Sequence, residues 1–490
     1  MTIYKTASIY LYIACALCLT GAYGPLAYAE DGEAKAVSLE ECIRMAAKNS
    51  FEVRLARLDL LIAGTDRGVA ESVFDTSLFS NISYADQQSR DNSAFGGHSL
   101  TNIYEGGASK TFHSGTELTS TVSDTRSWSN AGFTAQNPAH EVEVSLDGRQ
   151  PVGKNYFGVN DRRDISVTKL AIKNSGLDMK DRIEALFASV EESYRKWAFA
   201  KENLRIYNAI LKEAKDLYGI NKNNFDLGRI EKGDLLASQA NVITRRKNVR
   251  QAENDYRGAE EHVKLIINSA ESDRLYPSDE LKHEDIDVAL ESSLRTAFEK
   301  RRDYHKAKRE VKMKNITLKT KSNERFPEID LVGTYSANGI DRVFRKATKK
   351  FSGNDAYFFG GVEVTIPLEN SSADAEYDKA AHDKEKAILS LKSVERQILT
   401  DVGDAVRDYF THAATFKNLK EVADLQSEKL MEEEKRFNSG RSDTKRLIDY
   451  QQDSLNADLQ LANGVLDLEL ARISLEKTLN TMLDKYEGLL

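Results

Sequence analysis

Residues Glu141–Asp147 have the sequence EVEVSLD, with polar side chains at the odd positions and apolar side chains at the even positions. This period of two is typical of a β-strand whose two faces meet different surroundings. Proline follows at position 151, and residues 152–276 then contain no proline. A proline inside a helix costs about 3 kcal/mol, so its absence over such a length permits very long helices. The stretch therefore predicts a strand that leads into a long helix.

The same two signals recur along the chain. Alternation with period two returns in Leu78–Tyr84, Ile329–Tyr335 and Val362–Ile366, which brings the expected strands to four. Residues 368–490 again lack proline, and apolar residues recur there at spacings of three and four, for example from Leu455 to Ile473. A second apolar series runs along another face of the same helix. Two apolar faces favour a helix with neighbours on two sides, as in a bundle or a wall of helices.

The chain is also an internal repeat. Tyr84 returns as Tyr335, 251 residues later, whereas Gly228 returns as Gly440, 212 residues later. The first copy is therefore about 39 residues longer between its strands and its helical turn, because the two offsets differ by that amount. The excess falls within Gln87–His140, which is rich in Gly, Ser, Thr and Asn. The segment Phe112-His113-Ser114-Gly115 predicts a turn and with it an additional hairpin, which would either join the other strands or form a separate flap.

Three segments follow from these patterns. Residues 1–29 carry one charge, Lys5, then an apolar run and Ala27-Tyr28-Ala29, which is typical of a cleaved secretory signal peptide. We expect a first repeat over residues 30–276, with strands at about 74–150 and a helical tip near 228. We expect a second repeat over residues 277–490, with strands at about 328–367 and a tip near 440.

Composition and motifs favour neither catalysis nor nucleic-acid binding. The net charge is −8, with acidic and basic residues mixed along the chain, so the overall balance implies no polyanion as a partner. The most basic stretch, Lys300–Lys321, is expected to be a solvated helix face. The 8 His residues lack the spacing of metal ligands, and the motifs of nucleophilic serines and phosphate loops are absent. The sequence predicts no enzyme, no cofactor and no metal site.

Four motifs together resemble the TolC-like outer-membrane efflux family over essentially the whole mature chain. They are Leu39–Ala46 with Asn49, Arg325–Leu331, Val364–Asn370, and Arg436–Phe437 with Gly440 and Leu447–Gln451. The resemblance implies a mainly α fold with transmembrane β-strands. A trimeric barrel in the outer membrane, with about four strands from each subunit, would continue as a long α-helical tunnel in the periplasm. Physics agrees, because no segment after residue 29 has the ~20 apolar residues of a spanning helix and four strands cannot close a barrel alone.

The resemblance also implies the function and the partners. The chain would be the exit duct of a tripartite efflux or type I secretion system, passive and gated at its periplasmic tips. Its partners would be two further copies, a periplasmic adaptor protein, an inner-membrane pump and outer-membrane lipid. The alternative is a non-channel periplasmic coiled-coil adaptor or structural protein, which should show one helical hairpin between two halves of a lipoyl-like domain.

Family motifs place the candidate gate at the two helical tips. The gate and tip residues are Gly228, Asp234, Phe437, Gly440, Arg446 and Asp449. Asp449 and Asp234 match acidic positions near the family's tunnel entrance, where a trimer would gather three carboxylates around one axis. Arg446 and Phe437 depart from the pattern, because the family can carry an acid and a tyrosine there. A latch that needs the tyrosine hydroxyl is therefore absent.

Aromatic residues near the predicted strand ends are candidates for interfacial belts, with ordinary aromatic packing as the alternative for each of them. They are Tyr84, Trp128, Phe133, Tyr156, Tyr335 and Tyr357.

Overall fold

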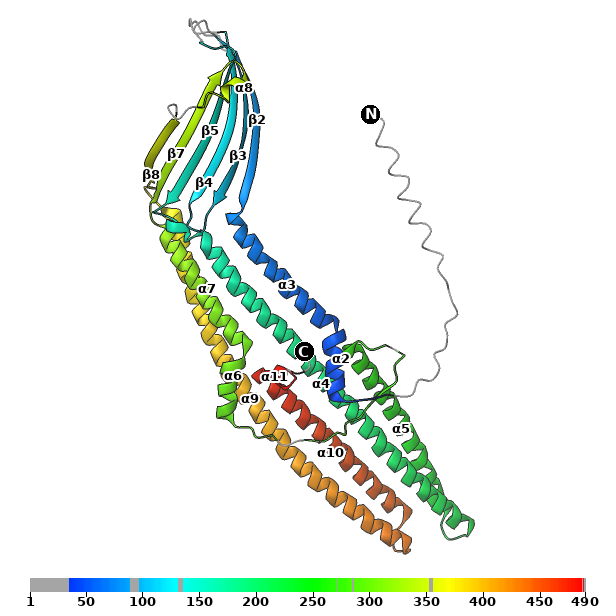
Figure 1. Ribbon diagram of the computed structural model, residues 1–490. Helices are drawn as coiled ribbons and strands as arrows, with labels where there is room; N and C mark the ends of the chain where they lie inside the picture. The colour runs from blue at the N-terminus through cyan, green and yellow to red at the C-terminus, as the bar shows by residue number, and fades with distance from the viewer. Residues whose placement is uncertain are drawn as a thin grey trace, which may run out of the picture.

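The computed structural model describes residues 35–88, 97–130, 135–270, 272–283, 286–351, 356–486 and 488. The molecule is elongated, with a curved β-sheet at one end and long helices at the other (Figure 1). The predicted signal peptide, residues 1–29, and Phe133 lie outside the described residues.

The order of helices and strands is similar in the two halves of the chain. The first half contains β1 (Lys35–Val37), α2 (Leu39–Asn49), α3 (Phe51–Glu71), η1 (Ser72–Phe74), β2 (Thr76–Gln88), β3 (His98–Thr111), β4 (Glu117–Ser129), β5 (Ala139–Pro151), η2 (Tyr156–Gly158), α4 (Asp161–Asp226) and α5 (Lys232–Ile267). The second half contains β6 (Leu275–Pro277), α6 (Leu290–Lys300), α7 (Arg302–Glu324), β7 (Glu328–Asp341), α8 (Phe344–Ala347), β8 (Ala356–Thr365), α9 (Ser371–Asn438), α10 (Thr444–Leu479) and α11 (Met482–Lys485).

The strand region forms one sheet of six antiparallel strands in the order β2-β3-β4-β5-β7-β8. The mainly α fold with a separate strand region is confirmed, and the sheet has two strands more than the four we expected. The additional strands are β3 and β4, which form a hairpin within the long stretch Gln87–His140. Their many Gly, Ser and Thr residues hide the alternation, because these small residues differ little in polarity.

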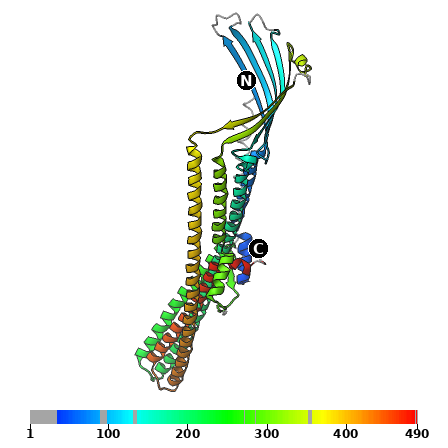
Figure 2. The same cartoon turned by 90° about the vertical axis from the view of Figure 1, so that its left-hand side faces the viewer.

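The two long helices are continuous. Helix α4 has 66 residues and α9 has 68 residues, so each is about 100 Å long at 1.5 Å per residue. Helix α4 forms a hairpin with α5 and α9 forms one with α10, and the two hairpins lie side by side because α10 also packs against α4 (Figure 2). No helix in the described part of the chain has both the length and the apolar composition that a membrane crossing needs.

The two apolar faces of α10 meet different neighbours, as the sequence predicts. On one face, Leu455 and Ala462 pack with Ile206 and Ile210 of α4. On another face, Leu475 joins a cluster with residues of α9. A helix held from two sides in this way belongs to a layer of helices.

The main hydrophobic core lies midway along the helices, where short elements surround α4. Phe187, Tyr194 and Trp197 of α4 are fully buried there, together with Ile43 of α2 and Met482 of α11. Full burial of each large apolar side chain contributes about 1.5–3 kcal/mol. The two halves of the chain also meet here, because β1 pairs in parallel with β6.

Candidate functional site: the two-faced sheet and the helical tips

One face of the six-stranded sheet is apolar, and most of it is exposed. Directly paired residues of neighbouring strands point to the same side of a sheet, so the strand register assigns each residue to a face. Leu78 of β2 is 82% exposed and Phe358 of β8 is 79% exposed, at opposite edges of this face. Other exposed residues of the apolar face are Ile82, Tyr84, Tyr104, Leu118, Val122, Val144, Leu146, Leu331, Tyr335, Val362 and Val364. Exposed apolar surface of this extent suits contact with lipid.

The opposite face of the sheet is mainly polar. Thr121, Ser145 and Ser336 are consecutive neighbours across β4, β5 and β7 on this polar face. Side chains on it also bond across strands, since Thr334 Oγ1 donates to Asp147 Oδ1 at 2.7 Å. A sheet with one apolar and one polar face is the pattern of a strand wall between lipid and a water-filled lumen.

Two of the residues predicted for the aromatic belts lie inside their strands and not at the strand ends. Tyr84 and Tyr335 are on the apolar face inside their strands. Trp128 lies near the end of β4, Tyr357 near the start of β8 on the polar face, and Tyr156 in η2. The expectation that all of these aromatics lie near strand ends is therefore wrong for Tyr84 and Tyr335.

The sheet does not close on itself in the single chain. Strands β2 and β8 stand at the two ends of the strand order, and in the described residues each pairs on one side only. An open edge exposes backbone N–H and C=O groups that hydrocarbon cannot satisfy. Strands from other chains must therefore complete the sheet if it lies in a membrane.

The two helical tips have the same backbone geometry. Gly228 and Gly440 have φ values of +66° and +70°, which is the left-handed region. At the first tip, Gly228 N donates to Phe225 O at 2.8 Å and Arg229 N donates to Asn224 O at 2.8 Å. At the second tip the equivalent bonds are 2.9 and 2.8 Å long. Both turns are therefore Schellman motifs, which end a helix and reverse the chain.

The predicted gate residues all lie at or near these tips. Asp234 lies half-buried in the first turn of α5, and Phe437 lies half-buried in the last turn of α9. Arg446 and Asp449 are exposed near the start of α10, where Asp443 caps the helix by accepting from Arg446 N at 2.8 Å. Among the described residues, no hydrogen bond or ion pair joins these gate side chains to one another within one chain.

Buried polar contacts near the tips were not predicted from the sequence. Asn221 of α4 is fully buried and donates to Thr444 Oγ1 of α10 at 3.1 Å, which joins the first hairpin to the second. Its repeat equivalent, Glu433, is 2% exposed and accepts from Ser442 Oγ in its own turn. In the sequence, Asn221 and Glu433 each lie four positions before a repeated phenylalanine. This spacing marks the two positions as equivalent but does not identify their hydrogen-bond partners.

A second polar contact joins the hairpins further from the tips. Arg245 of α5 is 2% exposed and donates to Gln452 Oε1 of α10 at 2.7 Å. Burial lowers the pKa of Arg245. Glu213 of α4 faces Arg245, but burial together with Glu434 and Asp458 raises its pKa. The contact between Arg245 and Gln452 therefore holds the two hairpins together, whereas the buried carboxyl group of Glu213 beside it destabilises their packing when it is ionised.

A buried ion network fixes the middle of the molecule. Arg472 of α10 donates to Glu191 of α4 at 2.6 Å and to Glu469 at 3.0 Å, and all three side chains are buried. Burial alone would raise the pKa of Glu191, but Lys485 and Arg472 outweigh it and hold that pKa below its ordinary value. The network therefore depends on charges that remain paired.

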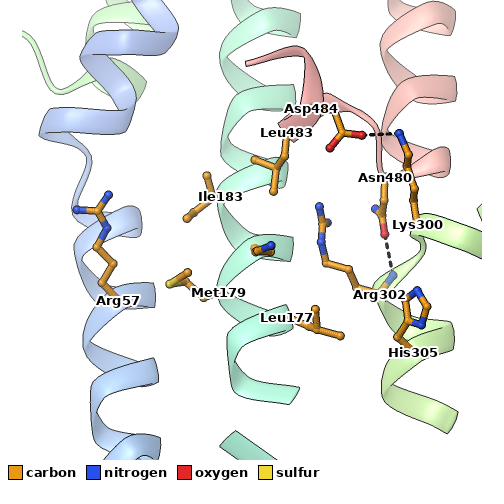
Figure 3. Close-up of a pocket in the computed structure, with 11 residues that line it drawn as sticks. Arg57, Leu177, Met179, Ile183, Lys300, Arg302, His305, Asn480, Leu483 and Asp484 are labelled. Carbon is orange, nitrogen blue, oxygen red and sulfur yellow. Dashed lines mark hydrogen bonds and ion pairs between the residues drawn. The ribbon is translucent and has the colours of Figure 1, made fainter. Parts of the chain in front are cut away.

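A hollow of about 390 Å³ lies beside this region, lined by residues of α3, α4, α6, α7 and α11 (Figure 3). Two of its basic side chains have acidic partners: Lys300 contacts Asp484 at 2.5 Å, and Arg302 contacts Asp181 at 3.0 Å and also Glu184. These contacts tie α7 and the end of α6 to α4 and α11, so we assign the hollow a structural role.

Known proteins share this arrangement. The model of the outer membrane efflux protein family matches residues 117–269 and 294–481. Among solved structures, a membrane protein from Pseudomonas aeruginosa has 17% identity and a TM-score of 0.66, and 90% of each chain is covered. The CmeC outer membrane channel of Campylobacter jejuni has 14% identity and a TM-score of 0.63, with 92% of this chain and 89% of that chain covered. The open state of the Neisseria gonorrhoeae MtrE outer membrane channel has 16% identity and a TM-score of 0.65, with 90% and 88% covered.

No curated protein matches the sequence. The two-faced sheet, its open edges and the paired long helices define a subunit of an outer-membrane channel. The family match covers more than half of the sequence, and the chain belongs to the outer membrane efflux protein family. It is accordingly a transport protein of the outer membrane and not an enzyme, as the family resemblance of its motifs implied.

Proposed function

We propose that three copies of this chain form a passive exit duct through the cell envelope. The joined sheets cross the outer membrane, and the joined helices form a tunnel in the periplasm. The observation that carries this proposal is the six-stranded sheet with one apolar face, one polar face and two open edges. Such a sheet needs both lipid and further strands, and only neighbouring copies supply strands with the same alternation.

The helical tips are the proposed docking and gating end of the duct. The two hairpins of a copy differ in sequence but end in the same Schellman turn, so three copies would present six similar tips to a periplasmic adaptor protein. An inner-membrane pump would supply the energy, because a channel of the outer membrane efflux protein family is not an enzyme and releases no energy itself. The presence of two long hairpins argues against the alternative of a periplasmic adaptor, which we expected to have one.

Reconstitution into planar bilayers tests the duct. We expect the purified protein to run as a trimer in detergent and to give discrete conductance steps in a bilayer. Deletion of the gene should sensitise the cells to at least one exported compound, and the intact gene should restore resistance. A water-soluble monomer that gives no conductance would overturn the proposal.

Asp449 is the proposed acidic residue of the tunnel entrance. It is exposed near the start of α10, and three copies would place three carboxylates around the tunnel axis. Asp449→Asn should reduce the preference for cations, and Asp449→Lys should reduce it further, as measured by the reversal potential in a salt gradient. Asp234→Asn tests the equivalent role for the first tip. If the reversal potential is the same for the native protein and both Asp449 variants, Asp449 is not a lumen residue.

A further inference from the structure

We infer that the outer-membrane part of this duct is an 18-stranded barrel, with the hairpin β3–β4 as part of its wall. The inference rests on the proposed trimer, because six strands in each of three copies give 18 strands. The sequence left open whether this hairpin lies in the sheet or forms an extracellular flap.

The strand register excludes a flap. Strand β3 pairs with β2 along its whole length, from Thr76↔Lys110 to Gln88↔His98. Strand β4 pairs with β3 and also with β5, from Glu117↔Arg149 to Ser127↔Ala139. The hairpin therefore separates β2 from β5 in the sheet, and removing it would break the continuity of the wall.

The turn of the hairpin also argues against an extracellular flap, because it lies at the end of the sheet next to the helices and a flap would lie at the opposite end. This turn lies next to the helices, since His113 stacks on Phe74 with ring centroids 4.1 Å apart. Gln150 at the end of β5 donates to Ser114 O at 3.1 Å. Gly115 lies so close to Gly158 of η2 that a Cβ on it would come within 2.6 Å of the Gly158 nitrogen. These contacts fix the turn at the periplasmic end of the sheet.

The two faces of the sheet continue across the hairpin. On the apolar face, Val122 of β4 pairs with Val144 of β5 and is 51% exposed. On the polar face, Thr121 pairs with Ser145 of β5 and with Gly107 of β3. The hairpin thus obeys the same inside and outside alternation as its neighbours, as a barrel wall requires.

The added strands widen the pore. With strands about 4.8 Å apart and tilted by about 40°, a barrel of 12 strands has a backbone diameter of about 24 Å, and one of 18 strands about 36 Å. Helices packed about 9 Å apart, twelve around a ring, enclose a diameter of about 34 Å. The wider barrel therefore matches the helical tunnel, and the strand region does not restrict cargo that the tunnel admits.

Site-directed spin labels test the position of the hairpin. Cysteines are introduced at Val122 or Thr121 of β4, with Val144 and Ser145 of β5 as matched references. The native Cys42 is fully buried, and burial raises its pKa to about 12. Cys15 and Cys18 lie in the predicted signal peptide and are changed to Ser in the labelled variants, so thiol labels react with the introduced cysteines. In the reconstituted full-length protein, labels at Val122 and Val144 should be relaxed by oxygen from lipid, and labels at Thr121 and Ser145 by a water-soluble nickel chelate.

The nickel chelate would relax the labels at Val122 and Thr121 equally if β4 were not part of the barrel wall, while the labels at Val144 and Ser145 of β5 would still differ. That result would overturn the inference. Chemical cross-linking of the same samples counts the copies, and any number other than three would also overturn the 18 strands. Loss of conductance with the alternation and the trimer intact would contradict the duct but not the barrel.

The segment around α8 carries a second, independent inference. We propose that it binds the phosphate groups of lipids in the outer leaflet. Helix α8 lies near the end of the sheet far from the long helices (Figure 1). It rests on the apolar face, because Val142 is only 3% exposed there and a Cβ on Gly339 would come within 2.3 Å of Ala347 O. Residues 342–351, which follow β7, therefore fold back onto the lipid side of the wall.

This segment combines apolar and basic side chains at the edge of the membrane. Val343 and Phe344 are each 50% exposed, and four basic residues around them are also exposed. The four are Arg342, Arg345, Lys346 and Lys349. None of them forms an ion pair with an acid in the described part of the chain, whereas Lys350 pairs with Asp341 at 2.9 Å. Apolar side chains in lipid with cations beside the headgroups form an interfacial site for anionic lipid.

Native mass spectrometry tests this lipid site on the reconstituted, full-length protein. Trimers released from nanodiscs of equal parts phosphatidylglycerol and phosphatidylcholine should retain more phosphatidylglycerol. The fourfold variant with Arg342, Arg345, Lys346 and Lys349 each changed to Gln should lose that preference. A control variant changes Lys386, Lys392, Lys417 and Lys420 of α9 to Gln, and it should keep the preference because these exposed residues lie on the periplasmic helix.

The phosphate group that binds here belongs either to a lipid or to free inorganic phosphate, and an excess of free phosphate distinguishes the two. This excess should not displace the bound lipid. Equal retention of both lipids by the native protein would overturn the site, as would the same loss in both variants. Conductance is measured in parallel, and its absence would contradict the duct without affecting the lipid preference.

Discussion

Arg472 binds two buried carboxylates in the middle of the molecule. It lies between Glu191 and Glu469, and its removal would leave two buried carboxylates without this partner. Breaking a buried pair from one side costs about 3–5 kcal/mol. Arg472→Met should therefore lower the free energy of unfolding by about that amount, measured by urea titration with the fluorescence of the buried Trp197.

The matched control for this prediction is Arg407→Met in α9. Arg407 forms an exposed pair with Asp404, and such pairs contribute about 0–1 kcal/mol. Equal losses in the two variants would show that the buried network has no special weight.

Glu213, in contrast to Arg472, destabilises the folded protein, and its effect on stability depends on pH. Its pKa is raised above the ordinary 4.5 by burial and by the nearby Glu434, Asp458 and Asp216, in spite of Arg245. A carboxyl group with a raised pKa in the folded state destabilises the fold as pH rises above 4.5, since only the unfolded chain ionises freely. Glu213→Gln should therefore raise the melting temperature at pH 7 and lose that gain below about pH 4.5. A gain that is the same at pH 4 and pH 7 would contradict this account.

Residues such as Asn221 and Arg472 show the limit of prediction from sequence at this scale. The partners Thr444 and Glu191 are 223 and 281 residues away in the sequence. Their contact exists only because the two hairpins lie side by side, and no local pattern encodes that placement. By contrast, Asp234, Phe437, Arg446 and Asp449 could be placed near the tips, because a repeated glycine marks each turn.

At the scale of elements, the tip turns depend on glycine for a purely conformational reason. Gly228 and Gly440 have positive φ, and apart from the two chain neighbours no heavy atom of the described residues lies within 4 Å of a Cβ built on either one. An alanine there would meet no clash, but the left-handed conformation costs it about 1–2 kcal/mol. Gly228→Ala and Gly440→Ala should each lower the free energy of unfolding by about that amount, measured by circular dichroism of the helices during urea titration.

Gly219→Ala in the interior of α4 is the control, and this change should raise the free energy of unfolding. This position also has free space around a Cβ, but its backbone is helical, where alanine is favoured by about 1 kcal/mol. A loss of stability at Gly219 similar to that at Gly228 would show that the conformation of the turn is not the cause.

The helices could be predicted because their signals are strong: long stretches without proline and apolar residues spaced by three and four. The strands with clear alternation, such as β5, could be predicted for the same reason. The faces of β3 and β4 could not be assigned, because Gly106, Gly107, Ser109 and Ser120 are small and suit either face, and the turn between the strands left a flap as an alternative. Their position in the sheet is determined by pairing with β2 and β5, which acts over a distance that local patterns do not cover.

At the scale of the whole molecule, the sheet must match the thickness of the membrane. Strand β5 has 13 residues, which at about 3.3 Å each and a tilt of about 40° reach about 33 Å along the membrane normal. That length exceeds the ~25 Å apolar band of an outer-membrane barrel, so the middle of β5 should lie near the membrane midplane. Val144 and Ser145 are at this middle and point to opposite faces.

This placement predicts opposite results for two neighbouring substitutions. Val144→Lys puts a charge into lipid near the midplane and should cost about 2–4 kcal/mol, whereas Ser145→Lys points to the polar lumen and should cost little. Unfolding in urea from lipid vesicles measures both costs, and fractionation of cells measures the share of each variant in the outer membrane. If the sheet is instead the half-buried sheet of a periplasmic domain, Val144→Lys is again the costlier change, but the native protein and the Ser145→Lys variant are recovered in the periplasmic fraction. Recovery of both in the outer membrane, together with loss of the Val144→Lys variant from it, therefore identifies a wall with lipid on one side and water on the other.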